Sequence, residues 1–234
     1  MPYTVEWIAE RIGAASAVNT QTTGNQLAPK VAENWVGGRI VVYLDESANG
    51  GQLLARFLGN DGLAFGTPVV VATQVNADES GGYDITIGSN LFDFRVTWAS
   101  DSGEILYREL DSNLSPQGPP LRIDTGPELD IRPTFDRGTA LIAWERVVNA
   151  TDHRIVYRDL GGGPIAMGPE VLVNAPIGLN SRPAITGYSG SEAYVSWDVG
   201  GAAVWTATYG FGGVAVSAPA VLDSNGTINR NPVM

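Results

Sequence analysis

The sequence predicts an all-β fold made of four copies of one unit of about 50 residues, and three observations lead to this expectation. Strand-opening prolines keep a regular spacing, since Pro133 and Pro183 are 50 residues apart and Pro29 lies 104 residues before Pro133. Aromatic residues that end an alternating strand recur once in each unit, at Tyr43, Trp98, Trp144 and Trp197. The apolar pattern inside each unit has a period of two, and no segment sustains the 3.6-residue period of a helix. Four strands in a unit of this length are typical of the blades of a β-propeller.

Each unit contains the same elements in the same order. A Pro-led strand, a turn and an alternating strand that ends in an aromatic residue are followed by a third strand, a glycine turn and a short fourth strand. The first two strands are expected within residues 25–45, 83–101, 130–146 and 180–199, and the last two within 53–76, 104–124, 153–174 and 203–223. In the third unit Leu141 and Ala143 alternate with Ile142 and Trp144, which is the pattern of a strand covered on both faces. The repeats therefore run over approximately 18–74, 75–126, 127–178 and 179–226.

Both ends of the chain carry fragments of a further unit. Residues 1–17 match the third and fourth strands of a repeat, and residues 227–234 match the start of a first strand. A ring closed by strands from both termini leaves no sheet edge exposed to template aggregation. We therefore expect a single domain over residues 1–234, a five-bladed propeller whose last blade is assembled from both termini. The second strand of that blade has no recognisable counterpart in the sequence.

Composition and charge narrow the function classes. The chain has no Cys and one His, which excludes disulfides, thiolate metal sites and sites with two His ligands. A net charge of −11 disfavours nucleic acid and anionic membranes as partners, and no apolar run is long enough for membrane insertion. The first twenty residues lack the basic and apolar regions of a Sec signal peptide. We expect an extracellular or particle-surface location reached without such a signal, with a cytoplasmic one left open.

Acids and arginines are expected to alternate around one mouth of the propeller channel. The turns between second and third strands share a face with the connections between blades. The acids that follow the second-strand aromatics are Asp45, Asp101, Glu145 and Asp198, and the arginines that end the connections are Arg132, Arg182 and Arg230. One interpretation is a polar rim that binds a sugar or another polar ligand, with arginine as a fork-shaped donor. The other is that each arginine pairs with an acid and holds neighbouring blades together.

Three further features of the sequence bear on possible binding sites. Trp35 lies in a turn on the opposite face, where an exposed aromatic ring would stack on a sugar or dock a partner. The segment Asp45–Gly50 resembles the opening of a calcium loop, but Arg56 stands where the closing Glu belongs, so we expect no cofactor and keep Ca²⁺ as the alternative. His153 is expected to be a polar surface residue, because no nucleophile motif accompanies it.

The repeat resembles one found in very large secreted bacterial proteins, the RTX-like and VCBS-like adhesins. Their unit reads approximately Q-x-x-P-x-V-A, then G-x-x-V-V-W, then I-x-A-R-x-F-x-x-x-G, then V-N. The matching residues here are Gln26, Pro29, Val31, Ala32, Ile40, Val41, Val42, Tyr43, Leu54, Ala55, Arg56, Phe57, Asp61, Gly62, Val75 and Asn76. This resemblance implies a propeller at a cell or particle surface, and it does not by itself imply a catalytic activity. The Gly-Gly-x-Gly-x-Asp nonapeptides of RTX calcium rolls are absent from the sequence.

The sequence therefore favours a non-catalytic binding or adhesion module that recognises a glycan through its rim. A structural or receptor-binding component of a virion or appendage, in contact with other subunits, is the first alternative. A five-bladed glycoside hydrolase is the second. Repeat symmetry argues against it, because equivalent acids in equivalent environments do not provide one raised and one lowered pKa.

Overall fold

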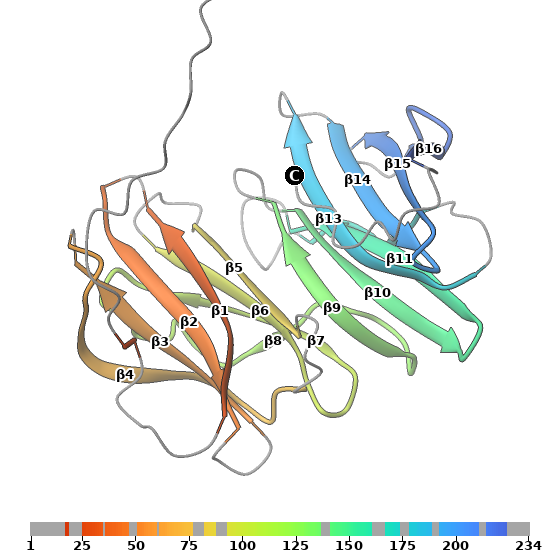
Figure 1. Ribbon diagram of the computed structural model, residues 1–234. Coiled ribbons are helices and arrows are strands. Elements are labelled where there is room, and N and C mark those ends of the chain that lie inside the picture. Colours follow the sequence, from red (N-terminus) through yellow and green to blue (C-terminus); the bar gives the residue numbers. More distant parts are fainter. Residues whose placement is uncertain are drawn as a thin grey trace, which may run out of the picture.

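The computed structural model contains four antiparallel sheets of four strands each (Figure 1). It describes residues 17–18, 25–34, 36–46, 51–59, 61–76, 82–87, 93–136, 141–160, 167–173, 178–188, 192–210 and 214–223, and none of these is helical. The predicted all-β, propeller-like architecture is therefore confirmed. The pieces assigned to a fifth blade lie almost entirely outside the described residues, as do Trp35 and Arg230.

Each sheet is one blade, and its strands follow one another in sequence from the first strand to the fourth. Blade 1 contains β1 (Gln26–Glu33), β2 (Arg39–Asp45), β3 (Gln52–Leu58) and β4 (Ala64–Thr73). Blade 2 contains β5 (Tyr83–Ile87), β6 (Phe94–Ala99), β7 (Ile105–Leu110) and β8 (Leu121–Arg122). Blade 3 contains β9 (Leu129–Phe135), β10 (Leu141–Asn149), β11 (Asp152–Asp159) and β12 (Val171–Leu172). Blade 4 contains β13 (Asn180–Tyr188), β14 (Glu192–Val199), β15 (Ala203–Gly210) and β16 (Ala220–Asp223).

The first strands of the four blades are the inner strands of the array. β1 contacts β5, β5 contacts β9, and β9 contacts β13, so consecutive blades meet through these strands. The second strands of blades 2 and 3 each lie between two described blades, and β6 is buried at all six of its residues. In β10 the residues Leu141–Trp144 are accordingly apolar on both faces, whereas in β6 the apolar Phe94, Val96 and Trp98 alternate with Arg95 and Thr97, which are buried as well.

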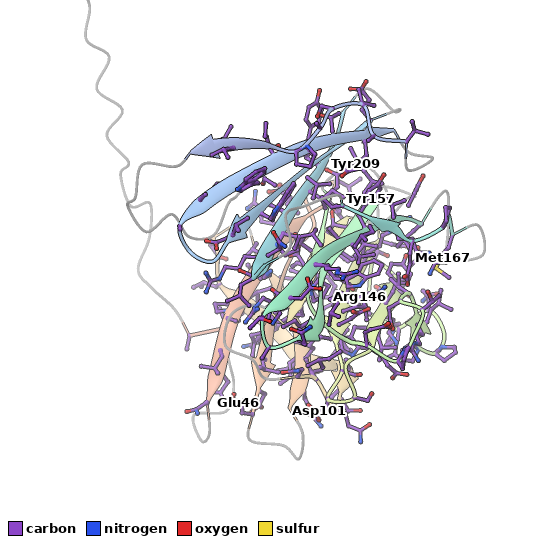
Figure 2. The ribbon with its side chains drawn as sticks, turned by 90° about the vertical axis from the view of Figure 1, so that its right-hand side faces the viewer. Glu46, Asp101, Arg146, Tyr157, Met167 and Tyr209 are labelled. Carbon is purple, nitrogen blue, oxygen red and sulfur yellow. The ribbon has the colours of Figure 1, made fainter. Side chains whose placement is uncertain are left out.

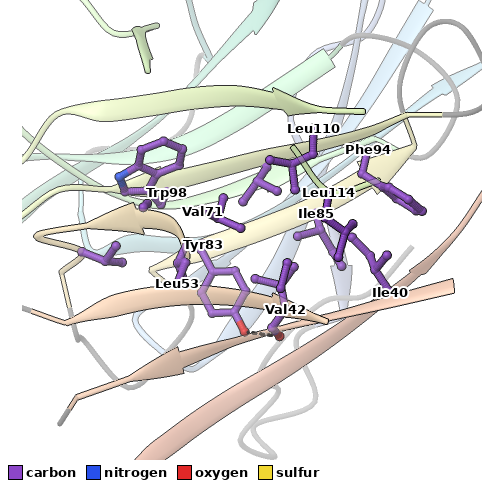
Figure 3. Close-up of a cluster of buried hydrophobic side chains, with 14 of the residues drawn as sticks. Ile40, Val42, Leu53, Val71, Tyr83, Ile85, Phe94, Trp98, Leu110 and Leu114 are labelled. Atoms are coloured by element: carbon purple, nitrogen blue, oxygen red, sulfur yellow. Dashed lines mark hydrogen bonds between the residues drawn. The ribbon is translucent and has the colours of Figure 1, made fainter. Parts of the chain in front are cut away.

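The apolar core is divided into layers that lie between blades. Three clusters of buried side chains join blades 1 and 2, blades 2 and 3, and blades 3 and 4. Each of the recurring tryptophans Trp98, Trp144 and Trp197 belongs to one of these clusters and is at most 1% exposed. Figure 3 shows the first cluster, in which the Tyr83 hydroxyl of blade 2 donates to the Val42 carbonyl oxygen of blade 1 at 2.9 Å. A single blade could not bury these faces alone, so the blades stabilise one another.

Polar contacts repeat across the same interfaces. Asp84 on β5 accepts from Lys30 of blade 1 at 3.2 Å, and from the Thr134 hydroxyl and the Phe135 amide of blade 3 at 3.1 and 2.8 Å. Arginines of the third strands donate to carbonyl oxygens in the last strand region of the preceding blade. Arg108 donates to Val71 at 2.6 Å, and Arg158 donates to Ile123.

The inner strands of blades 1, 3 and 4 carry the same backbone irregularity. The residue before the strand proline has a positive φ in each, 49° at Ala28, 52° at Arg132 and 50° at Arg182. The pairing register with the second strand shifts at these points, so each is a β-bulge. A left-handed backbone is costly for a non-glycine residue, and a residue before proline already has few allowed conformations. The bulge is therefore held in place by its surroundings, and in blades 3 and 4 it positions an arginine.

Candidate functional site

The candidate site is one end of the blades, here called the rim, where the inner strands begin and the second strands end. Pairing brings these points together, since Asp130 lies opposite Arg146 and Asn180 lies opposite Val199. Figure 2 shows Glu46 and Asp101, which follow the second strands of blades 1 and 2, at the same end of the molecule. The rim is thus a shared end of neighbouring blades.

Glu145 is the centre of the rim in blade 3, and its side chain is completely buried. Its Oε2 accepts from Arg132 Nη1 at 2.8 Å and, more weakly, from the Arg182 amide of blade 4 at 3.4 Å. Its Oε1 lies 2.7 Å from His153 Nδ1, which must be the donor because a carboxylate only accepts. Both carboxylate oxygens are therefore occupied, and one side chain connects the bulges of two blades.

His153 is part of this rim, which the sequence did not predict. It lies on β11 opposite Val147, and its backbone is bound to the connection between blades 3 and 4: the His153 amide donates to the Gly178 carbonyl at 2.8 Å, and its carbonyl accepts from Asn180 Nδ2 at 2.8 Å. Its side chain is 20% exposed. The only sequence signal was its position four residues before the third-strand tyrosine, which does not identify a partner on another strand.

Blade 4 has the same residue classes but a different arrangement. Asp198 occupies the position of Glu145, one residue after the second-strand tryptophan, and is 1% exposed. Its Oδ1 accepts from the Gly201 amide at 2.5 Å, whereas its Oδ2 has no hydrogen-bond partner among the described residues. The shorter Asp198 side chain forms no ion pair with Arg182 within 4.0 Å in the described part of the chain, unlike Glu145 and Arg132. Arg182 is therefore a partly exposed cation that the described residues leave without an acidic partner.

The acids of blades 1 and 2 do not occupy the position of Glu145. Asp45 follows Tyr43 by two residues and lies opposite Gln26, so its side chain is on the other face of its strand from Leu44, which takes the Glu145 position. Asp45 is 4% exposed and accepts from Gln26 Nε2 at 3.5 Å. Asp101 lies in the exposed turn beyond Ser100, and its amide donates to the Gln74 carbonyl at 3.0 Å. Of the expected rim residues, the structure brings together Arg132, Glu145 and Arg182, with Asp198 at the matching position of blade 4.

The residues of the expected calcium loop are described only at Asp45 and Glu46, since residues 47–50 are outside the described ranges. Glu46 Oε2 accepts from Asn25 Nδ2 at 3.0 Å. Within the described residues no three His, Asp or Glu side chains converge as metal ligands. The part of the chain that the structure describes contains no helix that is long and apolar enough to span a membrane.

A second polar position behind the rim supports the tryptophans. Asp130 accepts from Trp144 Nε1 at 2.9 Å, and Asn180, 50 residues later, accepts from Trp197 Nε1 at 3.1 Å. Desolvation raises the pKa of the Asp130 carboxyl, and the hydrogen bond from Arg146 opposes this shift. These contacts orient the inner strand against the second strand within one blade, so we assign them to the framework of the rim.

Comparison with known proteins supports the fold. No protein-family model and no curated protein sequence matches the chain. Among solved structures, the catalytic domain of a Coprinopsis cinerea GH62 α-L-arabinofuranosidase is similar over 93% of this chain and 75% of its own, with 13% identity and a TM-score of 0.52. A candidate TolB of Agrobacterium tumefaciens is similar over 86% of this chain and 68% of its own, with 12% identity and a TM-score of 0.51. TolB of Acinetobacter baumannii has 13% identity and a TM-score of 0.48, and the similarity spans 86% of this chain and 44% of that protein. The neighbours are propeller-type folds, and at these identities the likeness concerns the fold alone.

Proposed function

We propose that this protein is a non-catalytic binding module that recognises a glycan at the rim of blades 3 and 4. The observation that carries the proposal is the difference between two equivalent arginines. Arg132 is held by the buried Glu145 at 2.8 Å, whereas Arg182 has no acidic partner among the described residues. The first is a structural contact, and the second is a cation available to a ligand. Arginine is suited to this role because its planar fork of donors matches paired oxygen atoms.

The same geometry favours binding over glycoside hydrolysis. A glycosidase needs two carboxyl groups that reach opposite sides of the scissile bond. Glu145 has both oxygens occupied and no exposed surface, and Asp198 is 1% exposed. A hydrolysis screen on plant and bacterial polysaccharides tests this alternative, and release of sugar by the wild type would overturn the non-catalytic assignment.

The binding proposal is tested on an immobilised glycan array, followed by titration of the bound glycan. Arg182→Ala should weaken binding by about tenfold to a hundredfold, the loss of one charge-assisted hydrogen bond. Alanine already occupies the same bulge in blade 1, where Ala28 has a φ of 49°, so the backbone tolerates the change. Arg39→Ala is the matched control, since Arg39 begins β2 at the opposite end of the blade and pairs with Glu33. If no glycan binds the wild type, or both variants lose binding equally, the rim is not a glycan site and a scaffold role in a virion or appendage takes its place.

We also propose that the ring closes with a fifth blade formed by both termini. On the side of blade 1, Arg56 Nη1 donates to the Val18 carbonyl at 2.6 Å, as Arg158 of blade 3 donates to the Ile123 carbonyl of the preceding blade. On the side of blade 4, Asp198 offers a buried oxygen with no partner in the described part of the chain, at the position where Glu145 receives the amide of the next blade. The matching residue of a fifth blade is Asn231, which precedes Pro232.

A pair of equivalent arginines tests this closure. Arg56 and Arg158 each donate through Nε to a glycine carbonyl of their own blade, at 2.9 and 2.6 Å, and through Nη1 to the preceding blade. If the segment around Val18 is an outer strand of a docked blade, Arg56→Ala and Arg158→Ala should lower the melting temperature by similar amounts. Deleting residues 1–13 should in addition cause association by exposing an edge. Closure is refuted if Arg56→Ala leaves the melting temperature unchanged and the truncated chain stays monomeric and as stable as the full chain.

A further inference from the structure

We infer that the turn between β3 and β4 of blade 1 carries a second saccharide site, which binds a neutral pyranose by stacking on Phe65 and by hydroxyl donation to Asp61. This site is independent of the function proposed for the rim, because it lies at the other end of the strands. The rim is where β3 begins, at Gln52 opposite Asp45, whereas this turn follows Leu58, the last residue of β3. β4 is the outermost strand of the blade (Figure 1).

An exposed aromatic pair lies at this turn. Phe57 of β3 and Phe65 of β4 are cross-strand partners, and their rings stack with centroids 5.5 Å apart and an interplanar angle of 14°. Phe57 packs against the core between blades 1 and 2, so the stack is anchored on one side. Phe65 is nevertheless 54% exposed, because Phe57 covers one face of its ring and leaves the other open. The turn thus presents to solvent a flat aromatic ring whose orientation is fixed.

The fold does not require an aromatic pair at this turn. In the other three described blades, the third strand is also joined to the segment after the turn by a backbone hydrogen bond of 2.7 or 2.8 Å, but between residues of other types. The equivalent pairs are Glu109 and Gln117 in blade 2, Asp159 and Gly168 in blade 3, and Thr208 and Val216 in blade 4. Since non-aromatic pairs suffice to form the turn, the exposed ring of blade 1 points to a ligand.

A carboxylate lies beside the ring. Asp61, Leu63 and Phe65 line the same shallow hollow of about 540 Å³, together with Gly59 and Ala64. Asp61 Oδ1 accepts from the Leu63 amide at 3.0 Å, which orients the side chain, and Asp61 Oδ2 has no hydrogen bond with any described residue. Gly59 leaves room for this carboxylate, since a Cβ there would lie 2.6 Å from Asp61 Oδ1. The hollow therefore combines an apolar wall with one free acceptor, as ligand sites do.

These two groups together match a neutral pyranose. A pyranose ring has C–H groups on its face, which stack on the negative face of an aromatic ring, and hydroxyls at its edge. The Asp61 carboxylate only accepts, so the ligand must donate to it, as a sugar hydroxyl does. An anionic sugar would be repelled by this carboxylate and by the net charge of −11.

The test titrates the protein with four neutral hexasaccharides, cellohexaose, xylohexaose, mannohexaose and galactohexaose, by calorimetry and saturation-transfer NMR. We expect at least one of them to bind. Phe65→Gln should weaken it at least about tenfold, because the contact that buries the phenyl face is lost, and Phe65→Tyr should bind like the wild type. Asp61→Asn keeps an oxygen for the Leu63 amide but loses the charged acceptor, so affinity should fall about tenfold.

The variants include their own checks on folding and location. Gln117 occupies the position of Phe65 in blade 2, so Phe65→Gln should keep the melting temperature of the wild type. Gln117→Ala and Arg182→Ala should leave the affinity for the hexasaccharide unchanged, because they alter the turn of another blade and the rim.

The outcomes separate this inference from the function proposed for the rim. Affinity that is lost in Phe65→Gln and kept in Arg182→Ala supports the second site, even if the rim binds nothing. Affinity that is lost in Arg182→Ala and kept in Phe65→Gln belongs to the rim, so the second site is wrong and the proposed function stands. Absence of binding by all four hexasaccharides overturns the inference. So does a wild-type dimer in analytical ultracentrifugation that Phe65→Gln dissociates, since the ring is then a contact between two copies of the chain.

Discussion

Glu145→Gln is the perturbation that most directly tests the rim geometry. The substitution keeps the size of the side chain, removes its charge and replaces one acceptor oxygen by an NH₂ group. That group must then face either the Arg132 guanidinium, which cannot accept, or His153 Nδ1, which accepts only after a change of tautomer; these atoms lie 2.8 and 2.7 Å from the carboxylate. Each charge-assisted hydrogen bond contributes about 1.5–3 kcal/mol to stability. The side chains of Arg132 and His153 are 19% and 20% exposed, so in the variant water can hydrate them in part, and we use the lower value of this range for each bond.

We therefore expect Glu145→Gln to lower the free energy of unfolding by about 3 kcal/mol, or the melting temperature by roughly 6–12 °C for a chain of this size. Urea denaturation followed by tryptophan fluorescence measures the first quantity, and calorimetry measures the second. Glu104→Gln is the control, because Glu104 makes the same kind of pair with Arg122 at 2.9 Å but is 35% exposed, so its loss should cost about 0–1 kcal/mol. A cost below about 1 kcal/mol for Glu145→Gln, or equal costs for both variants, would show that Glu145 does not hold the two blades together.

Three further predictions concern the framework. Trp144→Ala should lower the free energy of unfolding by about 3–5 kcal/mol, because the indole is completely buried between blades; a urea midpoint unchanged from the wild type would contradict this packing. Asp84→Ala removes an acceptor shared by blades 1 and 3 and should cost about 2–3 kcal/mol in the same assay. The control is Asp61→Ala, which removes one hydrogen bond from the Leu63 amide in an exposed turn and should cost less than about 1 kcal/mol. Burial raises the pKa of the hydroxyls of Tyr83, Tyr107 and Tyr157. The unfolded chain then loses these protons first, so the contribution of these tyrosines to stability should be constant below about pH 10 and fall as pH rises above it. A urea midpoint that does not fall between about pH 9 and 12, or phenolate absorbance from all tyrosines of the folded protein near pH 10, would refute that burial.

The repeated unit could be predicted from the sequence because its signals are local. Strand alternation, the prolines and the tryptophans at Trp98, Trp144 and Trp197 are features of short segments of chain, and together they predicted the all-β class. The four strands of each unit were expected in the correct order, since a meander joins neighbours in sequence.

The roles of the rim residues could not be read in the same way. Asp45 and Glu145 both follow a second-strand aromatic, yet they differ by one residue in register, and a difference of one places their side chains on opposite faces of the strand. Sequence reasoning treats these two acids as equivalent, whereas in the structure their side chains contact different residues.

The sequence by itself determined the repeat, the fold class and the presence of arginines at the inter-blade connections. Only the tertiary structure decided that the Arg132 side chain pairs with Glu145 while that of Arg182 has no acidic partner among the described residues, and that His153 joins Glu145. The physical reason is that an ion pair forms only where the acidic side chain is long enough to meet a guanidinium on the neighbouring strand. Glu145 is one methylene longer than Asp198 and meets the guanidinium of its own blade, and His153 approaches from β11 through pairing of strands that its local sequence does not encode.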